Sequence, residues 1–212
     1  MKRFLVLLAV VTVFATMASA QGTDYEPKTF MLSAGYQKLN LRGAHINTFS
    51  VNAELIPLDY VGVKTSASWG ENYYSYSPFG LLAMFPALWM DEVDDLMSEY
   101  PFAALGMVLF GISSCQFHIP LGDQIELDFG WDEARITKVK KIEDETYITG
   151  SLNVGGSIYL GDNVFINPYY EYHHTHNWLY HLFGKDSTEN PFSEQPKELA
   201  GHSFGIKIGY KF

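Results

Sequence analysis

The segment YEYHHTHNWLYH, residues 170–181, holds the densest group of side chains that could do chemistry. Its four histidines are His173, His174, His176 and His181. On an extended strand His174 and His176 share a face, and imidazole is a common ligand for zinc or copper. Loop carboxylates such as Asp186 or Glu189 would have to complete such a site. The competing interpretation, which we favour, is a polar rim at a strand end that binds neither metal nor cofactor.

A second group of ionisable side chains is spread over segments in which polar and apolar residues alternate. If these segments are strands, the group lies on the polar face of the sheet. Charges in a narrow, poorly hydrated interior must pair, so we expect a salt-bridge and hydrogen-bond network rather than a pathway for protons or solutes. The members of this expected network are Glu54, Lys64, His118, Glu126, Asp128, Glu171 and Lys207.

The chain begins with a segment typical of a secretory signal peptide, residues 1–20. It has a basic start, an apolar core and small residues up to Ala20, after which we expect cleavage. A membrane anchor is the alternative, but the apolar run is shorter than the ~20 residues that a spanning helix needs. The net charge of −10 disfavours nucleic acid as a partner, and the single cysteine, Cys115, excludes an intramolecular disulfide.

Residues 21–212 are dominated by a period of two, which predicts strands. The alternating runs cover 29–39, 46–56, 60–70, 114–120, 124–132, 147–160, 163–176 and 205–212. Tight turns rich in Gly, Asp and Asn separate some of them, and the longer links between the others are 40–45, 72–110, 133–146 and 177–200. Short turns at one end, long links at the other and an even strand count predict an eight-stranded antiparallel up-and-down transmembrane β-barrel.

Alternation alone does not say which face of the sheet meets lipid. The polar face is mostly Ser, Thr, Asn, Gly and Gln, whereas a surface in water would carry more Lys and Glu. Aromatic residues collect near the expected strand ends, as in the girdles of membrane barrels. We therefore expect the apolar face to meet lipid. The alternative is a soluble, lipocalin-like barrel that carries an apolar ligand, with the two faces reversed.

The last eight residues, GIKIGYKF, place Ile206, Ile208, Tyr210 and the terminal Phe212 on one face. This ending resembles the C-terminal signal that outer-membrane barrels present to their insertion machinery, with Ile208, Tyr210 and Phe212 as its residues. With the strand and turn layout, it makes the chain similar to small eight-stranded outer-membrane proteins of the OmpA-transmembrane and OmpX type. The resemblance implies residence in the bacterial outer membrane, among its lipid and lipopolysaccharide.

The link 72–110 departs from the simplest barrels of this type. Apolar residues recur at helical spacing over 81–99, so we predict one or two short helices, with Pro86 opening or kinking the chain. We expect this insert on the outer side. It could be a lid or docking element for a lipid chain, an apolar ligand or a partner, or a structural cap, which is the interpretation that we favour.

The segment from His174 to Asn177 also resembles part of the catalytic motif of lipid A deacylases, which are eight-stranded outer-membrane barrels. The resemblance would make His174 the base and Glu189 the orienting acid, but His176 stands where the family has its serine nucleophile. We therefore expect a non-enzymatic outer-membrane scaffold that displays loops for binding, adhesion or envelope integrity, with the hydrolase as the alternative.

Overall fold

The computed structural model describes residues 29–58, 60–89, 109, 111–175 and 196–212. Its strands and helices are β1 (Thr29–Leu41), β2 (His45–Leu58), β3 (Val61–Gly70), β4 (Tyr73–Tyr76), α2 (Pro78–Trp89), β5 (Ser114–Pro120), β6 (Ile125–Val139), β7 (Glu143–Tyr159), β8 (Val164–His174), η1 (Lys197–Leu199) and β9 (Gly201–Lys211). No helix within the described residues is both long enough and apolar enough to span a membrane.

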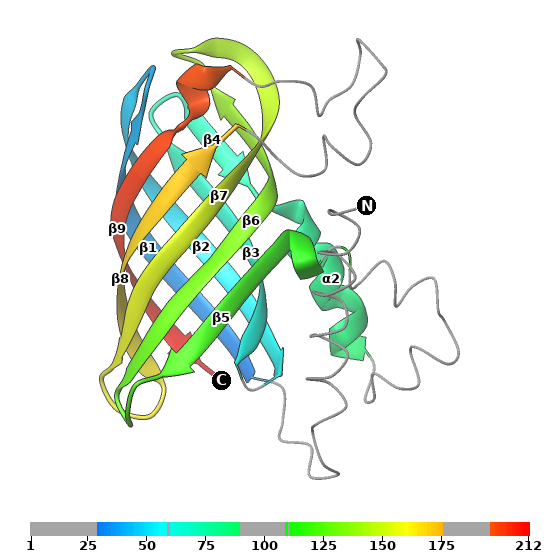
Figure 1. The fold of residues 1–212 in the computed structure, drawn as a ribbon, viewed down its shortest axis with the longest axis vertical. Helices are drawn as coiled ribbons and strands as arrows, with labels where there is room; N and C mark the ends of the chain where they lie inside the picture. The colour runs from blue at the N-terminus through cyan, green and yellow to red at the C-terminus, as the bar shows by residue number, and fades with distance from the viewer. Residues whose placement is uncertain (1–28, 59, 90–108, 110, 176–195) are drawn as a thin grey trace, which may run out of the picture.

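The strands form one antiparallel sheet that closes on itself (Figure 1). β1 pairs with β2 on one side and with β9 on the other, so that Ala34 lies between Val51 and Ile208. Closure lets each strand exchange backbone hydrogen bonds with two neighbours, which a sheet in hydrocarbon requires. The predicted eight-stranded antiparallel up-and-down barrel is therefore confirmed.

The barrel wall has eight strand positions, which we call staves. One of these positions is built from two short strands, β4 and β5. β4 pairs with β3 and β6 through Tyr76, which lies opposite Ala67 and Ile136. β5 continues the same stave lower down, and its Cys115 lies opposite Val63. The helical insert therefore leaves the wall partway along a stave and not at its end, and Figure 1 shows α2 beside the outside of the barrel.

This arrangement corrects the predicted boundaries of the insert. The prediction assigned residues 72–110 to a link, but 73–76 form β4. Its sequence, YYSY, favours a strand, because aromatic residues suit a pleated surface. Asn72, at a φ of 60°, forms the tight turn between β3 and β4. α2 begins at Pro78 and continues past Pro86 to Trp89, while residues 90–108, where part of the predicted helical stretch falls, lie outside the described residues.

Two other links predicted as long are short turns. β1 and β2 are joined by residues 42–44, and β6 and β7 by residues 140–142. The predicted loop at 133–146 is wrong for most of its length, since β6 and β7 extend into it. Strands can continue to pair beyond an apolar band, because backbone hydrogen bonding does not depend on which solvent the side chains meet. We call this end of the barrel the loop end, and the end with links 121–124 and 160–163 the turn end.

The apolar face of the sheet is on the outside. Phe49, Leu152 and Ile208 are 57%, 49% and 57% exposed, whereas Asn52 and Asp128 are 8% and 4% exposed. A soluble barrel that buries an apolar core would have these two sets exchanged. The structure thus has the sidedness of a barrel that spans a lipid bilayer.

Apolar clusters lie in the interior near both ends. The cluster at the loop end is formed by Leu39, Leu41, Ala44, Ile46, Tyr73, Val139 and Leu199. The smaller cluster at the turn end is formed by Met31, Ile56 and Phe165, with Tyr159 packed against it. The space between the two clusters is lined by polar and charged side chains, and these are the candidate functional residues.

Candidate functional site

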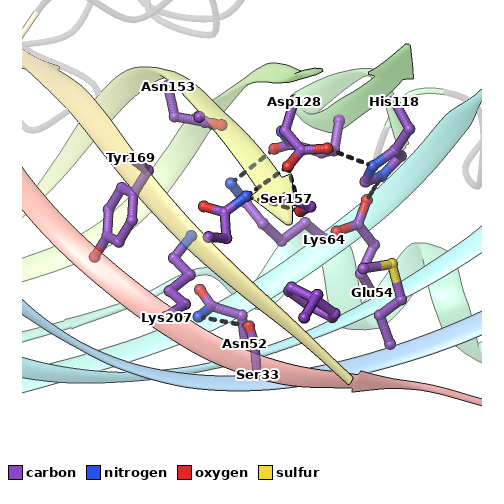
Figure 2. Close-up of a pocket in the computed structure, with 15 residues that line it drawn as sticks. Ser33, Asn52, Glu54, Lys64, His118, Asp128, Asn153, Ser157, Tyr169 and Lys207 are labelled. Atoms are coloured by element: carbon purple, nitrogen blue, oxygen red, sulfur yellow. Dashed lines mark hydrogen bonds and ion pairs between the residues drawn. The ribbon is translucent and has the colours of Figure 1, made fainter. Parts of the chain in front are cut away.

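The lower half of the interior, nearer the turn end, contains a histidine surrounded by carboxylates (Figure 2). The Nδ1 atom of His118 lies 2.7 Å from Oε1 of Glu126 and 2.8 Å from Oδ1 of Asp128. Its Nε2 atom lies 2.6 Å from Oε1 of Glu54. Three strands supply this group, because Glu54 is on β2, His118 on β5 and both other carboxylates on β6.

Glycine at position 62 lets Glu54 reach the histidine. β3 lies between β2 and β5 in the wall, so the Glu54 side chain must pass over it. A Cβ atom at Gly62 would lie 2.2 Å from Oε1 of Glu54, closer than any side chain tolerates. The sequence thus places its smallest residue where one side chain crosses the backbone of a neighbouring strand.

Neutral groups donate hydrogen bonds to the carboxylate oxygens of Asp128 and Glu126 that point away from His118. The hydroxyl of Ser157 donates to Oδ2 of Asp128 over 2.6 Å, and the amide of Asn167 donates to the same oxygen. The hydroxyl of Tyr159 donates to Oε2 of Glu126 over 3.3 Å. The oxygens that receive these bonds differ from those that face His118, so the orientation of both carboxylates is fixed.

Two lysines share this space. Nζ of Lys64 donates to Oε1 of Gln116 over 3.1 Å, and Nζ of Lys207 lies 3.9 Å above the ring centroid of Tyr169. Their two positive charges offset part of the charge of the three carboxylates. A cavity of about 40 Å³ lies between these side chains. It holds a few water molecules at most, since one water needs roughly 10–15 Å³ by this measure.

The upper half of the interior contains a second charged group. An NH1 group of Arg135 donates to Oε1 of Glu171 and, over 3.3 Å, to Oγ of Ser151. Ser151 also donates to Glu171 over 2.7 Å. Nε2 of His173 lies 3.6 Å from the other oxygen of Glu171 and 3.1 Å from Oγ of Ser203. All five side chains are buried, so they form a closed polar network rather than an open binding site.

Asp132 is the exception among the interior charges. It is 1% exposed, and within the described part of the chain neither carboxylate oxygen has a hydrogen-bond partner. The Oγ atom of Ser77 is likewise buried and unpaired there. Asp132 lies opposite Ser114, where the insert rejoins the wall. A buried carboxylate is costly unless neighbouring groups stabilise it, and Arg135 and Ser77 are neighbours that act on Asp132.

The insert is fastened to the wall by residues at both of its ends. A Cβ atom at Gly80 would lie 1.8 Å from the carbonyl oxygen of Lys64, so the first turn of α2 packs directly on the β3 backbone. At the other end the indole nitrogen of Trp131, on β6, donates to the carbonyl of Ile112 over 2.5 Å. Leu81 and Leu82 of α2 are each 49% exposed. An apolar surface beside a membrane-facing wall is suited to acyl chains.

The structure assigns positions to most of the predicted site residues. All seven members of the expected interior network face the lumen, but they fall into two groups. Glu54, His118, Glu126 and Asp128 make direct contacts, with Lys64 and Lys207 nearby, whereas Glu171 belongs to the upper group. His174 is on the outer face, where its Nε2 lies 3.3 Å from Oε1 of Glu133. His176 and Glu189, the other candidate metal ligand and candidate acid, lie outside the described residues.

Sequence reasoning missed two interior charges, Arg135 and Asp132. Arg135 falls in the segment predicted as a loop, so no facing was assigned to it. A bulge between Asp132 and Arg135 also breaks the period of two, and it turns Arg135 inward. Charge balance could have revealed Arg135, because the buried carboxylate of Glu171 needs a cation as its partner.

The residues proposed as an insertion signal lie on the outer face at the turn end. Ile208, Tyr210 and Phe212 are 57%, 43% and 63% exposed. The ring centroid of Phe212 lies 4.8 Å from that of Tyr210 and 5.9 Å from that of Phe30 on β1. These rings lie where β9 joins β1, at the seam that closes the barrel.

Comparison with known proteins gives similarity at the level of fold. No protein-family model matches the chain, and no curated protein matches it in sequence. Similar solved structures include the outer membrane protein OprG from Pseudomonas aeruginosa, with a TM-score of 0.45 and 11% identity over 89% of this chain and 97% of that one. The Yersinia pestis outer membrane protein Ail gives a TM-score of 0.44 and 11% identity over 88% of this chain and 100% of that one. The N-terminal barrel domain of P. aeruginosa OprF gives a TM-score of 0.43 and 8% identity over 87% of this chain and 97% of that one.

Proposed function

We propose that this chain resides in the bacterial outer membrane as a closed, non-enzymatic barrel that serves as a scaffold for its loop-end surface and its insert. The observation that carries the proposal is the combination of a lipid-type exterior with an interior that is filled by its own side chains. Signal-peptide cleavage after Ala20 and export would precede insertion, and Ile208, Tyr210 and Phe212 would be presented to the insertion machinery.

The polarity of the outer face supports an orientation in the membrane. Side chains that point outward near the loop end are polar and exposed, including Lys38, His45, Asn47 and His202. Further down the same strands the outward residues are apolar, such as Val51 and Ile206. The loop end therefore extends beyond the apolar band. With the turn end in the periplasm, this extension faces the cell exterior, whereas α2 leaves the wall partway along its length and lies beside the barrel (Figure 1).

The filled interior favours a scaffold function and disfavours a pore. Apolar clusters near both ends and the charged networks between them leave a cavity of only about 40 Å³. A hydrated ion needs a continuous wide path, which eight-stranded barrels fill with side chains. Lipid, including lipopolysaccharide, is then the main partner. The exposed Leu81 and Leu82 of α2 support contact with acyl chains at the side of the wall.

Three measurements on one preparation test this proposal. We expect the protein in the outer-membrane fraction, faster migration of the unboiled form on a denaturing gel, and no conductance steps in planar bilayers. Recovery from the soluble periplasm would refute membrane residence. Regular conductance steps from heat-modifiable protein would refute the closed scaffold while leaving membrane residence intact.

Hydrolysis of lipopolysaccharide is the second candidate function, and the ion pair of His174 with Glu133 favours it. A histidine held by a carboxylate has the composition of a general base with its orienting acid. Under this alternative, purified protein releases fatty acid from lipopolysaccharide and His174→Ala abolishes the release. A folded preparation that releases none from competent substrate would remove the alternative.

A further inference from the structure

We propose that His118, Glu126 and Asp128 form a binding site for one divalent transition-metal ion, zinc being the best match. One potential ligand atom from each residue lies within 4.8 Å of the other two. Imidazole nitrogen and carboxylate oxygen are established zinc ligands, and a mixed nitrogen and oxygen set favours such metals over magnesium or calcium. This site is separate from His174 and His176, the pair that the sequence suggested.

The contacts of Nδ1 are the first argument. This nitrogen can carry at most one hydrogen, yet it faces two carboxylate oxygens, at 2.7 Å from Glu126 and 2.8 Å from Asp128. One proton cannot form two well-aligned bonds to acceptors on different residues. A cation placed between the three atoms interacts with all of them at once. Binding would replace the ring proton and release it to solvent, as metal binding to histidine does.

The surroundings of the three ligands are the second argument. Metal-bound histidines usually donate their other ring nitrogen to a carboxylate, which fixes the tautomer and raises the basicity of the ligand atom. Glu54 occupies that place, with Oε1 2.6 Å from Nε2 of His118. The bonds from Ser157 to Asp128 and from Tyr159 to Glu126 go to the oxygens that face away from Nδ1. The oxygens aimed at Nδ1 are thus free to act as ligands.

The available space is the third argument. In a tetrahedral centre with bonds of about 2.0–2.1 Å, ligand atoms lie about 3.3 Å apart, so each carboxylate oxygen must move roughly half an ångström away from Nδ1. His118 and Asp128 line the interior cavity of about 40 Å³, which gives their side chains room to move. The same cavity has room for a water molecule as the fourth ligand.

The experiment loads the metal while the barrel forms, because all three ligands are buried inside the finished barrel. Protein is refolded into detergent with Zn²⁺, dialysed against metal-free buffer and analysed for metal content. Refolding with Co²⁺ gives a visible absorption spectrum that reports nitrogen and oxygen ligands. We expect one ion per barrel, no retained Mg²⁺, and loss of the ion in His118→Gln and Asp128→Asn. Glu54→Gln should weaken binding about 10–100-fold without removing the ligands.

His173→Gln is the matched control, because His173 is also buried in the lumen beside a carboxylate but faces only Glu171. This variant should keep the ion. The double variant His174→Gln/His176→Gln should also keep the ion, and it tests the pair that the sequence suggested. Heat-modified migration shows that each variant is folded, and if His118→Gln does not fold, Asp128→Asn decides. The proposal is overturned if folded wild type retains no ion, or if the ion stays in folded His118→Gln or Asp128→Asn.

Discussion

Ser77 and Ser114 occupy nearly consecutive places along one stave of the barrel wall, although the whole insert separates them in the chain. The backbone N–H of Ser77 donates to the carbonyl of Ser66 over 2.8 Å, and the hydroxyl of Ser114 donates to the carbonyl of Lys64. Between these two, the hydroxyl of Thr65 donates to the carbonyl of Ser77 over 2.6 Å. Bonds from side chains thus replace the missing backbone ladder where the stave is interrupted.

This register predicts that the insert can be removed without opening the barrel. Only Thr65 lies opposite the break on β3, so a single residue should bridge from Ser77 to Ser114. It also keeps the alternation, since Ser75, Ser77, Ser114 and Gln116 all face inward. Replacing residues 78–113 by one threonine should give a protein that still migrates as a heat-modifiable barrel. A variant that never folds would show that the insert helps to form the wall.

The same variant tests the role of the insert in the cell. If the insert acts in binding, adhesion or envelope integrity, the variant should reach the outer membrane yet lose that phenotype, for example detergent resistance or attachment to host cells. The matched control carries a scrambled sequence of equal length between Ser77 and Ser114. Wild-type behaviour of the shortened protein in every assay would leave the insert without a function in these processes.

A second prediction concerns Gly80, where α2 rests on β3. A methyl group there would collide with the carbonyl oxygen of Lys64, an atom of the sheet backbone that cannot move freely. Gly80→Ala should therefore lower the free energy of unfolding by about 1–3 kcal/mol, despite the higher helix propensity of alanine. Urea unfolding in lipid vesicles measures this change. Gly156→Ala is the control, because its new methyl would lie 3.7 Å from the nearest atom and should change little.

The sequence was sufficient to predict the barrel and its sidedness because both depend on a pattern that is local and repeated. The alternation of Phe49, Val51 and Ala53 with polar neighbours already specifies which side of β2 meets lipid. The same alternation identified Glu54 and His118 as inward-facing. The alternation could not show that Glu54 and His118 meet. Their contact depends on Gly62, in the strand between them, because the Glu54 side chain passes over this glycine.

Other features could not be predicted because they break the local pattern. The bulge in β6 adds one residue to the strand and turns Arg135 inward, and a rule of strict alternation cannot foresee it. The position of the insert within a stave depends on long-range register, since β4 is only four residues long and its neighbours in the wall are β3 and β6. The pairing of His174 with Glu133 likewise depends on how β6, β7 and β8 are staggered.

A third prediction uses the buried pair of Arg135 and Glu171. Removing one partner leaves the other charge in the interior without compensation, which typically costs about 3–5 kcal/mol. Arg135→Met and Glu171→Leu should each destabilise the barrel to that extent. The double variant should be more stable than either single variant, because it leaves neither charge behind. Reversible urea unfolding followed by tryptophan fluorescence gives the four free energies. If the two effects simply add, the pair is not coupled as its contact indicates.

A fourth prediction tests the sidedness on which membrane residence depends. Val51 lies near the centre of β2 and is 44% exposed on the outer face. If that face meets the middle of a bilayer, Val51→Lys places a charge in hydrocarbon and should lower the free energy of unfolding in vesicles by about 2–4 kcal/mol. Leu121, in a turn at the opposite end from the loops, is 65% exposed. Leu121→Lys should cost only about 0–1 kcal/mol, because a lysine there reaches water. In a soluble barrel both changes would add a charge to a surface in water. Equal small changes in the free energy of unfolding would therefore contradict a lipid-facing exterior, as would release of the Val51→Lys protein into aqueous buffer.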